Sequence, residues 1–444
     1  MSSWQPNSWQ SKPALQQANY PSSNTLEENL TRLSHLPPLV TSWEVEALKE
    51  ELAAATRGEA FVLQGGDCAE NFDDCESEII TNKMKILLQM SLVLVHGLNK
   101  KVIRVGRIAG QYAKPRSADM ETKGDISLPS YRGDLINGPE FTKADRIPDP
   151  VRLLRGYGRA AMTLNFIRAL SDCGFADLHY PENWDLDFVK HSPLADEYHA
   201  VVNDLSRSLK FMDMLGGDNG ELSRIRFYSS HEGLHLNYEQ ALTRQVPNRK
   251  GFYNLSTHLP WVGLRTADLD GAHIEYFRGI ENPVGVKIGA EMSTNMVRQL
   301  AETLNPKNEA GKLIFIHRFG AQKIADGLPP IIEAIQQSGH QVLWISDPMH
   351  GNTESTKNGY KTRRFENILS ELEQAFDIHK NCSSHLGGIH FELTGDDVTE
   401  CIGGARGLDE EGLKRAYKSQ VDPRLNYEQA LEIAMAIVRK QKTI

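Results

Sequence analysis

The sequence contains few cysteines, and their distribution excludes one common class of protein. There are five cysteines among 444 residues, an odd number scattered along the chain. They are Cys68, Cys75, Cys173, Cys382 and Cys401. A small secreted domain held together by disulfides would carry an even and dense set. We therefore expect a reducing compartment, in which a cysteine can serve as a metal ligand instead of half of a disulfide.

The chain also lacks an excess of positive charge and long apolar runs. Lysine and arginine number 49 against 58 acidic residues, a formal net charge of -9, which argues against a general nucleic-acid or membrane-surface binder. The apolar run SLVLVHGL is far too short to cross a bilayer. The polar beginning MSSWQPNSWQ lacks the apolar segment of a signal peptide. We expect a cytoplasmic protein without nucleic-acid or membrane partners.

The sequence does contain a regular alternation of strand-like and helix-like segments. Short apolar runs typical of buried strands occupy 60–64, 101–105, 224–230, 258–263, 283–288, 312–317, 341–346 and 387–393. Between them, apolar residues recur at helical spacing, as at Leu328, Ile331, Ile332 and Ile335 before Gly339. This alternation predicts an α/β fold with a parallel sheet. Eight such units predict a closed (β/α)8 TIM barrel, with an open doubly wound sheet as the alternative.

Two segments fall outside this alternation. Residues 1–57 contain clusters of Pro, Ser and Asn with one helical pattern, WEVEALKEELAAA, and we predict an N-terminal extension to a catalytic barrel over 58–444. A long stretch between the second and third predicted strands contains two amphipathic helical patterns, and we predict a helical insertion there over residues 140–222. Ser192 and Pro193 form a suitable N-cap and first-turn pair for the second helix.

Polar residues that follow the predicted strands are candidates for chemistry, because side chains at the carboxyl ends of barrel strands do the work in this fold. Four of them form a mixed ligand set: Cys68, His350, Glu392 and Asp422. Such a set suits a catalytic divalent cation with one position open to substrate, namely Mn, Co, Zn or Fe(II). The alternative is that the four are unrelated: a buried thiol, a hydrogen-bonded histidine, a solvated acid and a helix cap.

A second set of residues at the strand ends is cationic. Its members are Arg107, Lys114, Arg116, Arg265, Lys287 and Arg318. The planar guanidinium of arginine suits bidentate binding of phosphate or carboxylate, and a lysine in an apolar strand end is costly to bury unless paired. The two sets together indicate a metal beside a site for phosphate- and carboxylate-bearing substrates. Salt bridges with neighbouring acids are the alternative for the cations.

Several longer motifs resemble those of one enzyme family. They are LQGGDCAE, GRIAGQYAKPRS, RTADLDGAH, NPVGVK, DPMHGNT, GYKTR, GGIHFELTG, VTECIGG and DPRLNYEQALE. From residue 60 onward the chain resembles type II 3-deoxy-D-arabino-heptulosonate 7-phosphate (DAHP) synthases, and its long insertion resembles that of the long-form members. The resemblance implies a (β/α)8 barrel. It also implies a metal-dependent, aldol-like condensation of phosphoenolpyruvate with erythrose 4-phosphate that releases phosphate, the first step of the shikimate pathway.

The resemblance also implies roles for individual residues. The family's metal ligands correspond to Cys68, His350, Glu392 and Asp422, with Mn(II) or Co(II) expected and Zn(II), Fe(II) or Cd(II) as alternatives. Its phosphoenolpyruvate site corresponds to Arg107, Leu264, Arg265, Lys287 and Arg318. Its site for the phosphate of erythrose 4-phosphate corresponds to Lys114, Arg116 and Ser117. The catalytic candidates are Lys287, Arg265, His350 and Glu232, the last as a water-orienting acid.

The chain departs from the family pattern beside the expected phosphoenolpyruvate site. In WVGLRTADLDGAH, Leu264 stands where the family has an acid, and Ala267 stands where it has a basic residue. Ala290 and Phe319 replace the usual proline and methionine nearby. Leucine cannot replace the hydrogen bonds of an acid. Two alternatives follow: the same chemistry on a different aldose or imine acceptor in a secondary-metabolite pathway, or a non-catalytic regulatory relative.

The resemblance implies partners as well. In long-form members the N-terminal extension and the inserted helices build subunit contacts, so we expect a homodimer or homotetramer. The same elements build effector sites, which implies an aromatic amino acid effector. A chorismate mutase is the protein partner that the resemblance suggests.

Overall fold

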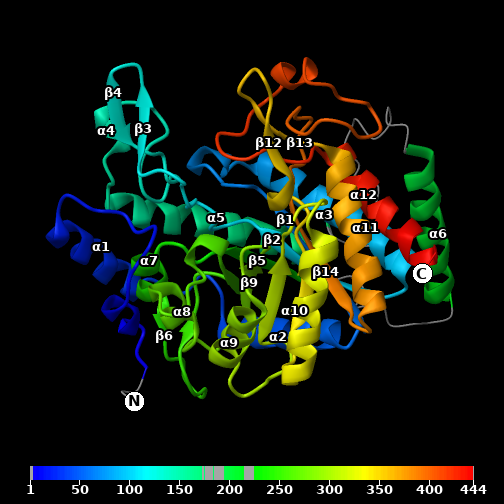
Figure 1. Ribbon diagram of the computed structural model, residues 1–444, viewed down its shortest axis with the longest axis horizontal. Coiled ribbons are helices and arrows are strands. Elements are labelled where there is room, and N and C mark those ends of the chain that lie inside the picture. The colour runs from blue at the N-terminus through cyan, green and yellow to red at the C-terminus, as the bar shows by residue number, and fades with distance from the viewer. Residues whose placement is uncertain (1–3, 173–174, 176–183, 185–194, 215–224, 444) are drawn as a thin grey trace.

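The computed structural model describes residues 4–172, 175, 184, 195–214 and 225–443. Its long parallel strands are β1 (Ala60–Gly66), β2 (Lys101–Arg107), β5 (Phe227–Glu232), β8 (Leu259–Val262), β9 (Val284–Ile288), β10 (Leu313–His317), β11 (Leu343–Ser346) and β14 (Leu386–Glu392). They close into a barrel in the order β1-β14-β11-β10-β9-β8-β5-β2 (Figure 1). The predicted (β/α)8 barrel is therefore confirmed, and the open sheet is wrong. The third strand ends at Glu232, two residues later than predicted, so this acid belongs to the strand itself.

Helices surround the barrel. They are α3 (Ser77–Leu98), α7 (Leu236–Ala241), α8 (Ala272–Phe277), α9 (Thr294–Leu304), α10 (Ile324–Ser338), α11 (Phe365–Asn381) and α12 (Tyr427–Thr443). The residues predicted to form the apolar face of α10 are all buried, and Gly339 ends the helix with φ +71°. A positive φ is tolerated without strain by glycine, which explains why this helix stops there. The last helix, α12, packs against α3 and α11 and so closes the ring (Figure 1).

The alternation of side chains along each strand determines which residues meet inside the barrel. Val62 on β1 belongs to the apolar cluster that fills the barrel, whereas its neighbours Phe61 and Leu63 pack outward. The same two-residue period continues to the carboxyl end of each strand. It turns these polar side chains inward: Arg107, Glu232, Lys287, Arg318, Asp347 and Glu392. The pattern that builds the core therefore also builds a charged end.

The opposite end of the barrel is closed by helix α2 (Ser42–Thr56). Thr41 caps this helix, and Glu44 returns a hydrogen bond to the Thr41 backbone in a capping box. Leu48 and Leu52 are fully buried in the same cluster as the inward-facing strand residues. The helical pattern predicted in the N-terminal extension is thus confirmed, and it covers the bottom of the barrel.

The N-terminal region contains a further helix that we did not predict. Helix α1 (Ser23–His35) packs against α5 (Val151–Asp172) and α7. Its N-cap, Ser22, accepts a hydrogen bond from the Thr25 backbone, and this serine within the polar stretch is the signal that could have indicated the helix.

The segment between β2 and β5 contains the predicted inserted helices. These are α5 and α6 (Ala195–Met214); a short helix that we did not predict, α4 (Lys143–Arg146), precedes them. The helices follow a hairpin of β3 (Met120–Lys123) and β4 (Ile126–Pro129) that extends from the barrel (Figure 1). Helix α6 packs on α3 (Figure 1). Ser192 and Pro193, the predicted cap, lie outside the described residues. In the described part of the chain, every helix is too short or too polar to cross a bilayer.

Short elements complete the fold. They are the strands β6 (Thr243–Arg244), β7 (Tyr253–Asn254), β12 (Thr353–Ser355) and β13 (Lys361–Arg363), and the 3-10 helices η1 (Ser8–Ser11), η2 (Phe72–Asp74), η6 (Leu264–Thr266), η7 (His350–Asn352) and η8 (Gly412–Arg415). Of these, η6, η7 and β13 lie directly beside the charged end of the barrel.

Candidate active site at the carboxyl end of the barrel

A cavity of about 470 Å³ opens at the carboxyl ends of the strands. Its lining includes all six predicted cations together with Ser117, Glu232, Leu264, His350 and Asp422. Its volume lies within the range usual for small-molecule sites, about 300–1,000 Å³. Residues from both predicted sets therefore share one cavity.

The four predicted metal ligands lie together at this end of the barrel: His350 and Asp422 line the cavity, and Cys68 and Glu392 are buried beside them. Ligand atoms of Cys68, Glu392 and Asp422 all lie within 4.8 Å of one another, and the Cys68 Sγ is 3.8 Å from Asp422 Oδ2. His350 lies beside this group, with its Nε2 3.0 Å from Glu392 Oε1. Cys68 follows β1, Glu392 ends β14 and Asp422 precedes α12. The closed barrel thus unites residues up to 354 positions apart.

An ammonium group lies among these ligands. Lys114 Nζ is 2.8 Å from Cys68 Sγ, 3.0 Å from Glu392 Oε1 and 3.2 Å from Asp422 Oδ2. Burial opposes its charge, yet the thiol and the two carboxylates raise the pKa of Lys114. The arrangement therefore attracts a cation. A thiol, an imidazole and two carboxylates in a buried setting also fit a divalent metal by their donor chemistry.

Burial raises the pKa of Cys68 to about 12, with a further contribution from Glu392. The thiol therefore keeps its proton at neutral pH, and a strong cation beside it is needed to obtain the thiolate that binds metals. Glu392 behaves in the opposite way. Burial alone would raise its pKa, but His350, Lys114 and the two arginines beside it hold the pKa well below the ordinary value.

His350 is oriented by the aspartate three residues before it. Asp347 Oδ2 lies 2.7 Å from His350 Nδ1 and also contacts Lys287 Nζ. Asp347 Oδ1 accepts hydrogen bonds from the backbone N–H groups of Met349 and His350. With Nδ1 occupied in this way, Nε2 is directed toward Glu392, as is usual when a carboxylate orients a metal-binding histidine. The stretch DPMHGN is thus a turn in which the aspartate aims the histidine.

Lys287 is buried on β9, and the Asp347 carboxylate is its ion-pair partner. Burial lowers the pKa of Lys287 to about 8, against the opposing effect of Asp347. A lysine in this state carries its charge at neutral pH and gives up a proton more readily than an exposed lysine.

Two arginines support Glu392 from the sides. Arg107 Nη2 donates to Glu392 Oε1 at 2.9 Å, and Arg363 Nη2 lies 2.8 Å from Glu392 Oε2. Arg107 also packs over the Trp261 ring, 5.2 Å from its centroid. Arg107, which was predicted to bind phosphoenolpyruvate, therefore uses part of its guanidinium to hold Glu392, one of the predicted metal ligands.

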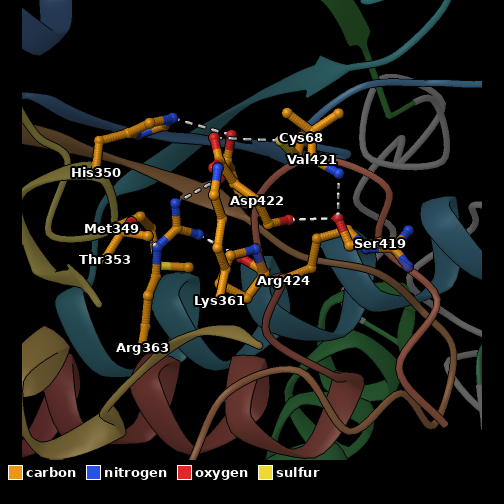
Figure 2. Close-up of polar contacts among 12 residues, drawn as sticks. Cys68, Met349, His350, Thr353, Lys361, Arg363, Ser419, Val421, Asp422 and Arg424 are labelled. Atoms are coloured by element: carbon orange, nitrogen blue, oxygen red, sulfur yellow. Dashed lines mark hydrogen bonds and ion pairs between the residues drawn. The ribbon is translucent and has the colours of Figure 1, made fainter. Parts of the chain in front are cut away.

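Asp422 is held by its own turn and by β13 (Figure 2). Ser419 Oγ donates to the Asp422 backbone carbonyl at 2.6 Å, and Lys361 Nζ donates to Asp422 Oδ1 at 3.1 Å. Arg363 donates to the carbonyl of Pro423, the next residue. Figure 2 shows Asp422 between Cys68 and Lys361.

Guanidinium groups surround the mouth of the cavity. Arg318 Nη2 donates to the His350 carbonyl at 2.7 Å, and exposed Arg265 donates to Ser117 Oγ at 3.1 Å. Among the described residues, the Arg116 guanidinium has no hydrogen-bond or ion-pair partner, and the buried Arg318 Nε has none either. Leu264 occupies η6 next to Arg265 and packs partly into the core. The mouth therefore offers positive charge that the protein itself does not neutralise.

Glu232 lines the cavity at the end of β5. Its backbone N–H donates to Gln111 Oε1 at 2.9 Å, whereas its buried Oε1 finds no partner among the described residues. Burial raises the pKa of Glu232, although Lys114, His350 and Lys287 oppose the shift. The side chain is thus a carboxyl group that can hold a proton inside a cationic cavity.

Sequence reasoning assigned no role to three of the supporting residues, Asp347, Lys361 and Arg363. Asp347 was visible three positions before His350, a spacing that lets an aspartate side chain bond to the following turn. Lys361 and Arg363 lie in the motif GYKTR, two residues apart on one face of β13. Their sequence positions do not reveal that β13 reaches over the barrel to Glu392.

Comparison with known proteins agrees with this geometry. The model of the Class-II DAHP synthetase family matches residues 4–438. A Streptomyces coelicolor protein named phospho-2-dehydro-3-deoxyheptonate aldolase is 47% identical over 432 residues, covering 97% of this chain and 96% of that protein. A Neurospora crassa protein of the same name is 47% identical over 451 residues, covering 98% of this chain and 93% of that protein. The chain belongs to the class-II DAHP synthetase family.

Proposed function

We propose that the protein condenses phosphoenolpyruvate with erythrose 4-phosphate to give DAHP and phosphate, with a divalent metal held at the barrel end. The observation that carries the proposal is the charged end of the barrel, where unneutralised guanidinium groups line one cavity with His350 and Asp422, and the Cys68 thiol and the Glu392 carboxylate are buried beside them. Cations of this kind bind phosphate and carboxylate. The name of the relatives at 47% identity supports the same activity.

The cavity has separate groups for the two substrates. Lys287, Arg265 and Arg318 line one side, and we assign to them the phosphate and carboxylate of phosphoenolpyruvate. Arg116 and Ser117 line the cavity from the loop that leads to the hairpin β3–β4, and we assign to them the phosphate of erythrose 4-phosphate. Ser117 Oγ accepts from Arg265 at 3.1 Å, so the two groups adjoin. Lys114 instead contacts the metal-ligand group, so its contribution to that phosphate is weaker than the family pattern implies. Fixing both substrates turns a bimolecular reaction into an effectively unimolecular one.

The reaction forms one carbon–carbon bond and breaks one carbon–oxygen bond. C3 of phosphoenolpyruvate attacks the aldehyde carbon, and the aldehyde oxygen takes a proton. Water adds at C2, which has become electron-poor, and loses a proton. The C2–O bond to phosphate then breaks and phosphate leaves with the bonding electrons, while the C2 hydroxyl gives up its proton, which phosphate takes, and becomes the C2 ketone. The sum is one phosphoenolpyruvate, one erythrose 4-phosphate and one water converted to DAHP and phosphate.

The residues that would hold the metal are Cys68, His350, Glu392 and Asp422, with Mn(II) or Co(II) as the expected ions. When bound, the cation would supply Lewis-acid polarisation of the aldehyde. Asp347 fixes the tautomer and direction of His350, and Arg107 and Arg363 fix Glu392. These contacts keep the ligand side chains in place before any substrate arrives.

Proton movements fall to the groups whose pKa values are shifted toward neutrality. Lys287, with its pKa lowered to about 8 by burial, can give a proton to an oxygen near C3 and C2. Glu232, whose pKa is raised by burial, can orient the water that adds at C2 and accept its proton. Both side chains line the cavity, which places them within reach of the substrate positions assigned above.

A second candidate is the same chemistry on another acceptor. The observation that favours it is Leu264, which lines the cavity beside Arg265 where the family pattern has an acid. An apolar side chain leaves the adjacent guanidinium without a hydrogen-bonding neighbour at that point. The acceptor preference is therefore the part of the function that this substitution is expected to change.

A panel of acceptors separates the candidates. Phosphate release from phosphoenolpyruvate would be followed with erythrose 4-phosphate and with other phosphorylated and unphosphorylated aldoses, in the wild type and in Leu264→Glu. Highest kcat/KM with erythrose 4-phosphate supports the proposal. A preference for another aldose that Leu264→Glu reverses supports the second candidate. A folded wild type that binds Mn(II) and phosphoenolpyruvate but turns over with no acceptor would favour a regulatory relative.

Assembly and regulation complete the proposal. We propose a homodimer or homotetramer in which the extension over 1–57 and the insertion over 140–222 contribute contacts to the barrel over 58–444. Val151 and Met162 on α5 are large apolar side chains that are at least half exposed, which supports a subunit contact there. Light scattering tests the assembly. Rates and melting temperatures with Trp, Phe, Tyr and a chorismate mutase test an effector and a protein partner.

A further inference from the structure

The first residues of the described chain lie along helix α8, on the outside of the barrel. Trp4 Nε1 donates to the Glu275 carbonyl at 2.8 Å, and the Ala272 N–H donates to the Pro13 carbonyl at 2.9 Å. Both contacts are with helix α8, which follows β8. The segment is therefore fixed to the barrel at several points before it reaches the cavity.

Gln16 joins this segment to the loop that carries Arg116. Its Oε1 accepts from the Arg116 backbone N–H at 2.9 Å, and its Nε2 donates to the Arg116 carbonyl at 3.0 Å. One side-chain amide thus satisfies both backbone groups of a single residue. The same Oε1 also accepts from Arg132 Nη1 at 3.0 Å. Gln16 therefore fixes the backbone position of Arg116 from outside its own loop.

The next residue makes the corresponding contact with the loop after β5, the strand that pairs with β2. Gln17 Nε2 donates to the Leu234 carbonyl at 2.8 Å, and Gln17 Oε1 accepts from the Leu236 N–H at 3.0 Å. Leu234 lies two residues after Glu232. The two adjacent glutamines thus connect the loop after β2, which lines the cavity, with the loop after β5, which follows the cavity-lining Glu232.

The backbone at Gln16 is adapted to this double contact. Gln16 has φ +62°, a left-handed conformation that non-glycine residues rarely adopt. In this conformation two consecutive side chains reach two different loops. Strain of this kind persists where surrounding contacts enforce it and often marks a functional position.

We infer that Gln16 is a positioning residue that holds the Arg116 backbone so that its guanidinium meets the phosphate of the acceptor. The inference rests on the proposed function, because it assigns the acceptor phosphate to Arg116. The Arg116 guanidinium has no hydrogen-bond or ion-pair partner among the described residues, so its place in the cavity depends on the Arg116 backbone. Gln16 itself does not line the cavity.

The test compares Gln16→Gly with Gln10→Gly in the full-length protein. Glycine removes the clamp and tolerates the positive φ, so the substitution adds no backbone strain. Gln10 lies in the same segment and is exposed, and among the described residues its side chain makes only a 3.4 Å hydrogen bond, to Gln240. We expect Gln16→Gly to raise the KM for erythrose 4-phosphate roughly tenfold, the effect of losing one or two net hydrogen bonds, while the KM for phosphoenolpyruvate stays within about twofold. Gln10→Gly should change neither.

Hydrogen exchange provides a readout that does not depend on turnover. The Arg116 amide donates to Gln16 Oε1, so its exchange should be faster in Gln16→Gly than in the wild type and in Gln10→Gly. A wild type without turnover would refute the proposed function, and faster exchange would still establish the clamp. Unchanged exchange, an unchanged KM for erythrose 4-phosphate, or equal losses for both substrates would overturn the inference.

Discussion

The two ends of the barrel contain a buried lysine each, and the two lysines have different surroundings. At the carboxyl end, Lys287 faces the cavity and pairs with the Asp347 carboxylate. At the opposite end, Lys312 is buried beneath α2 and donates to the backbone carbonyls of Ile280 and Asn282. Burial lowers both pKa values, to about 8 for Lys287 and about 7 for Lys312.

The difference shows that a shifted pKa alone does not identify a functional group. Lys287 shares its carboxylate with His350, lines a cavity and stands among unneutralised arginines. Lys312 lines none of the cavities of the described chain that we find, and its hydrogen-bond partners are fixed backbone atoms. The carboxyl end of the barrel therefore supplies chemistry, and the opposite end supplies stability. The predictions below test this division, from the largest expected effect to the smallest.

The strongest test exchanges the same residue at both ends. Lys287→Met should lower kcat/KM by about 10²–10³-fold, because it removes a cation placed against the developing charge. Lys312→Met should leave kcat/KM within about twofold, because no part of it reaches the cavity. Steady-state rates with both substrates give kcat/KM for the wild type and for each variant. Comparable losses in the two variants would contradict the division.

The support for His350 provides a second test. Asp347→Asn keeps the shape of the side chain but removes the charge that orients the imidazole, so metal affinity should fall about 10- to 100-fold. Titration with Mn(II) measures this directly. Asp268→Asn, an exposed aspartate beyond η6, serves as the control and should bind the ion as the wild type does. Equal Mn(II) affinity in Asp347→Asn and in the wild type would show that Asp347 does not orient His350 for metal binding.

The bottom of the barrel should affect folding without affecting catalysis. Leu52→Ala leaves a cavity under α2, where this side chain is fully buried, and should lower the free energy of unfolding by about 2–5 kcal/mol. Ile126→Ala, on the exposed hairpin, should change it by less than about 0.5 kcal/mol. Urea unfolding gives both values. Altered substrate KM values in Leu52→Ala would show that the two ends are coupled.

The smallest predicted effect is a pH dependence of stability due to Lys312. Its pKa is about 7 in the folded protein, against an ordinary value of 10.5, so between these values the unfolded chain binds more protons and stability rises with pH. From pH 7 to 8.5 this contribution amounts to about 1.5 kcal/mol. Burial is the main cause of the lowered pKa of Lys312, and the charge of Lys49 lowers this pKa further. The carboxylates of Glu281, Glu309 and Glu46 act in the opposite direction and raise it. Unfolding free energies of the wild type and Lys312→Met, measured at both pH values, should differ in slope by this amount. Parallel slopes would contradict the shift.

The fold could be predicted from the sequence because each barrel strand is a short apolar run that can be recognised on its own. Eight apolar runs separated by helical patterns predicted the barrel, and helices such as α10 were predicted to their terminal glycine. Helix α1 was missed because its apolar stripe, Leu26, Leu30 and Leu33, consists of three leucines within an otherwise polar stretch. The hairpin β3–β4 was missed because its strands are short and largely exposed.

The candidate site was accessible only in part. The predicted metal ligands follow or end strands or precede a helix: Cys68, His350, Glu392 and Asp422. Because the carboxyl ends of barrel strands meet at one end of the barrel, the sequence alone could place these residues together. Which contacts support them depends on tertiary structure: Arg363 reaches Glu392 from β13, and Gln16 reaches Arg116 across 100 positions. Lys114 was assigned to a phosphate from its motif, whereas its ammonium group lies among the metal ligands. Spacing in the sequence does not encode these distances.

The central claim is that a cation held at the carboxyl end of the barrel is required for the reaction of phosphoenolpyruvate with erythrose 4-phosphate. The most direct measurement follows the ultraviolet absorbance of phosphoenolpyruvate with EDTA-treated protein, with and without Mn(II) or Co(II), and with and without the aldose. Cys68→Ser and Cys75→Ser provide the matched pair, since only Cys68 belongs to the ligand group. We predict absorbance loss only when metal and erythrose 4-phosphate are both present, retained in Cys75→Ser and largely lost in Cys68→Ser. Loss that continues without metal, or that survives equally in both variants, would contradict the claim.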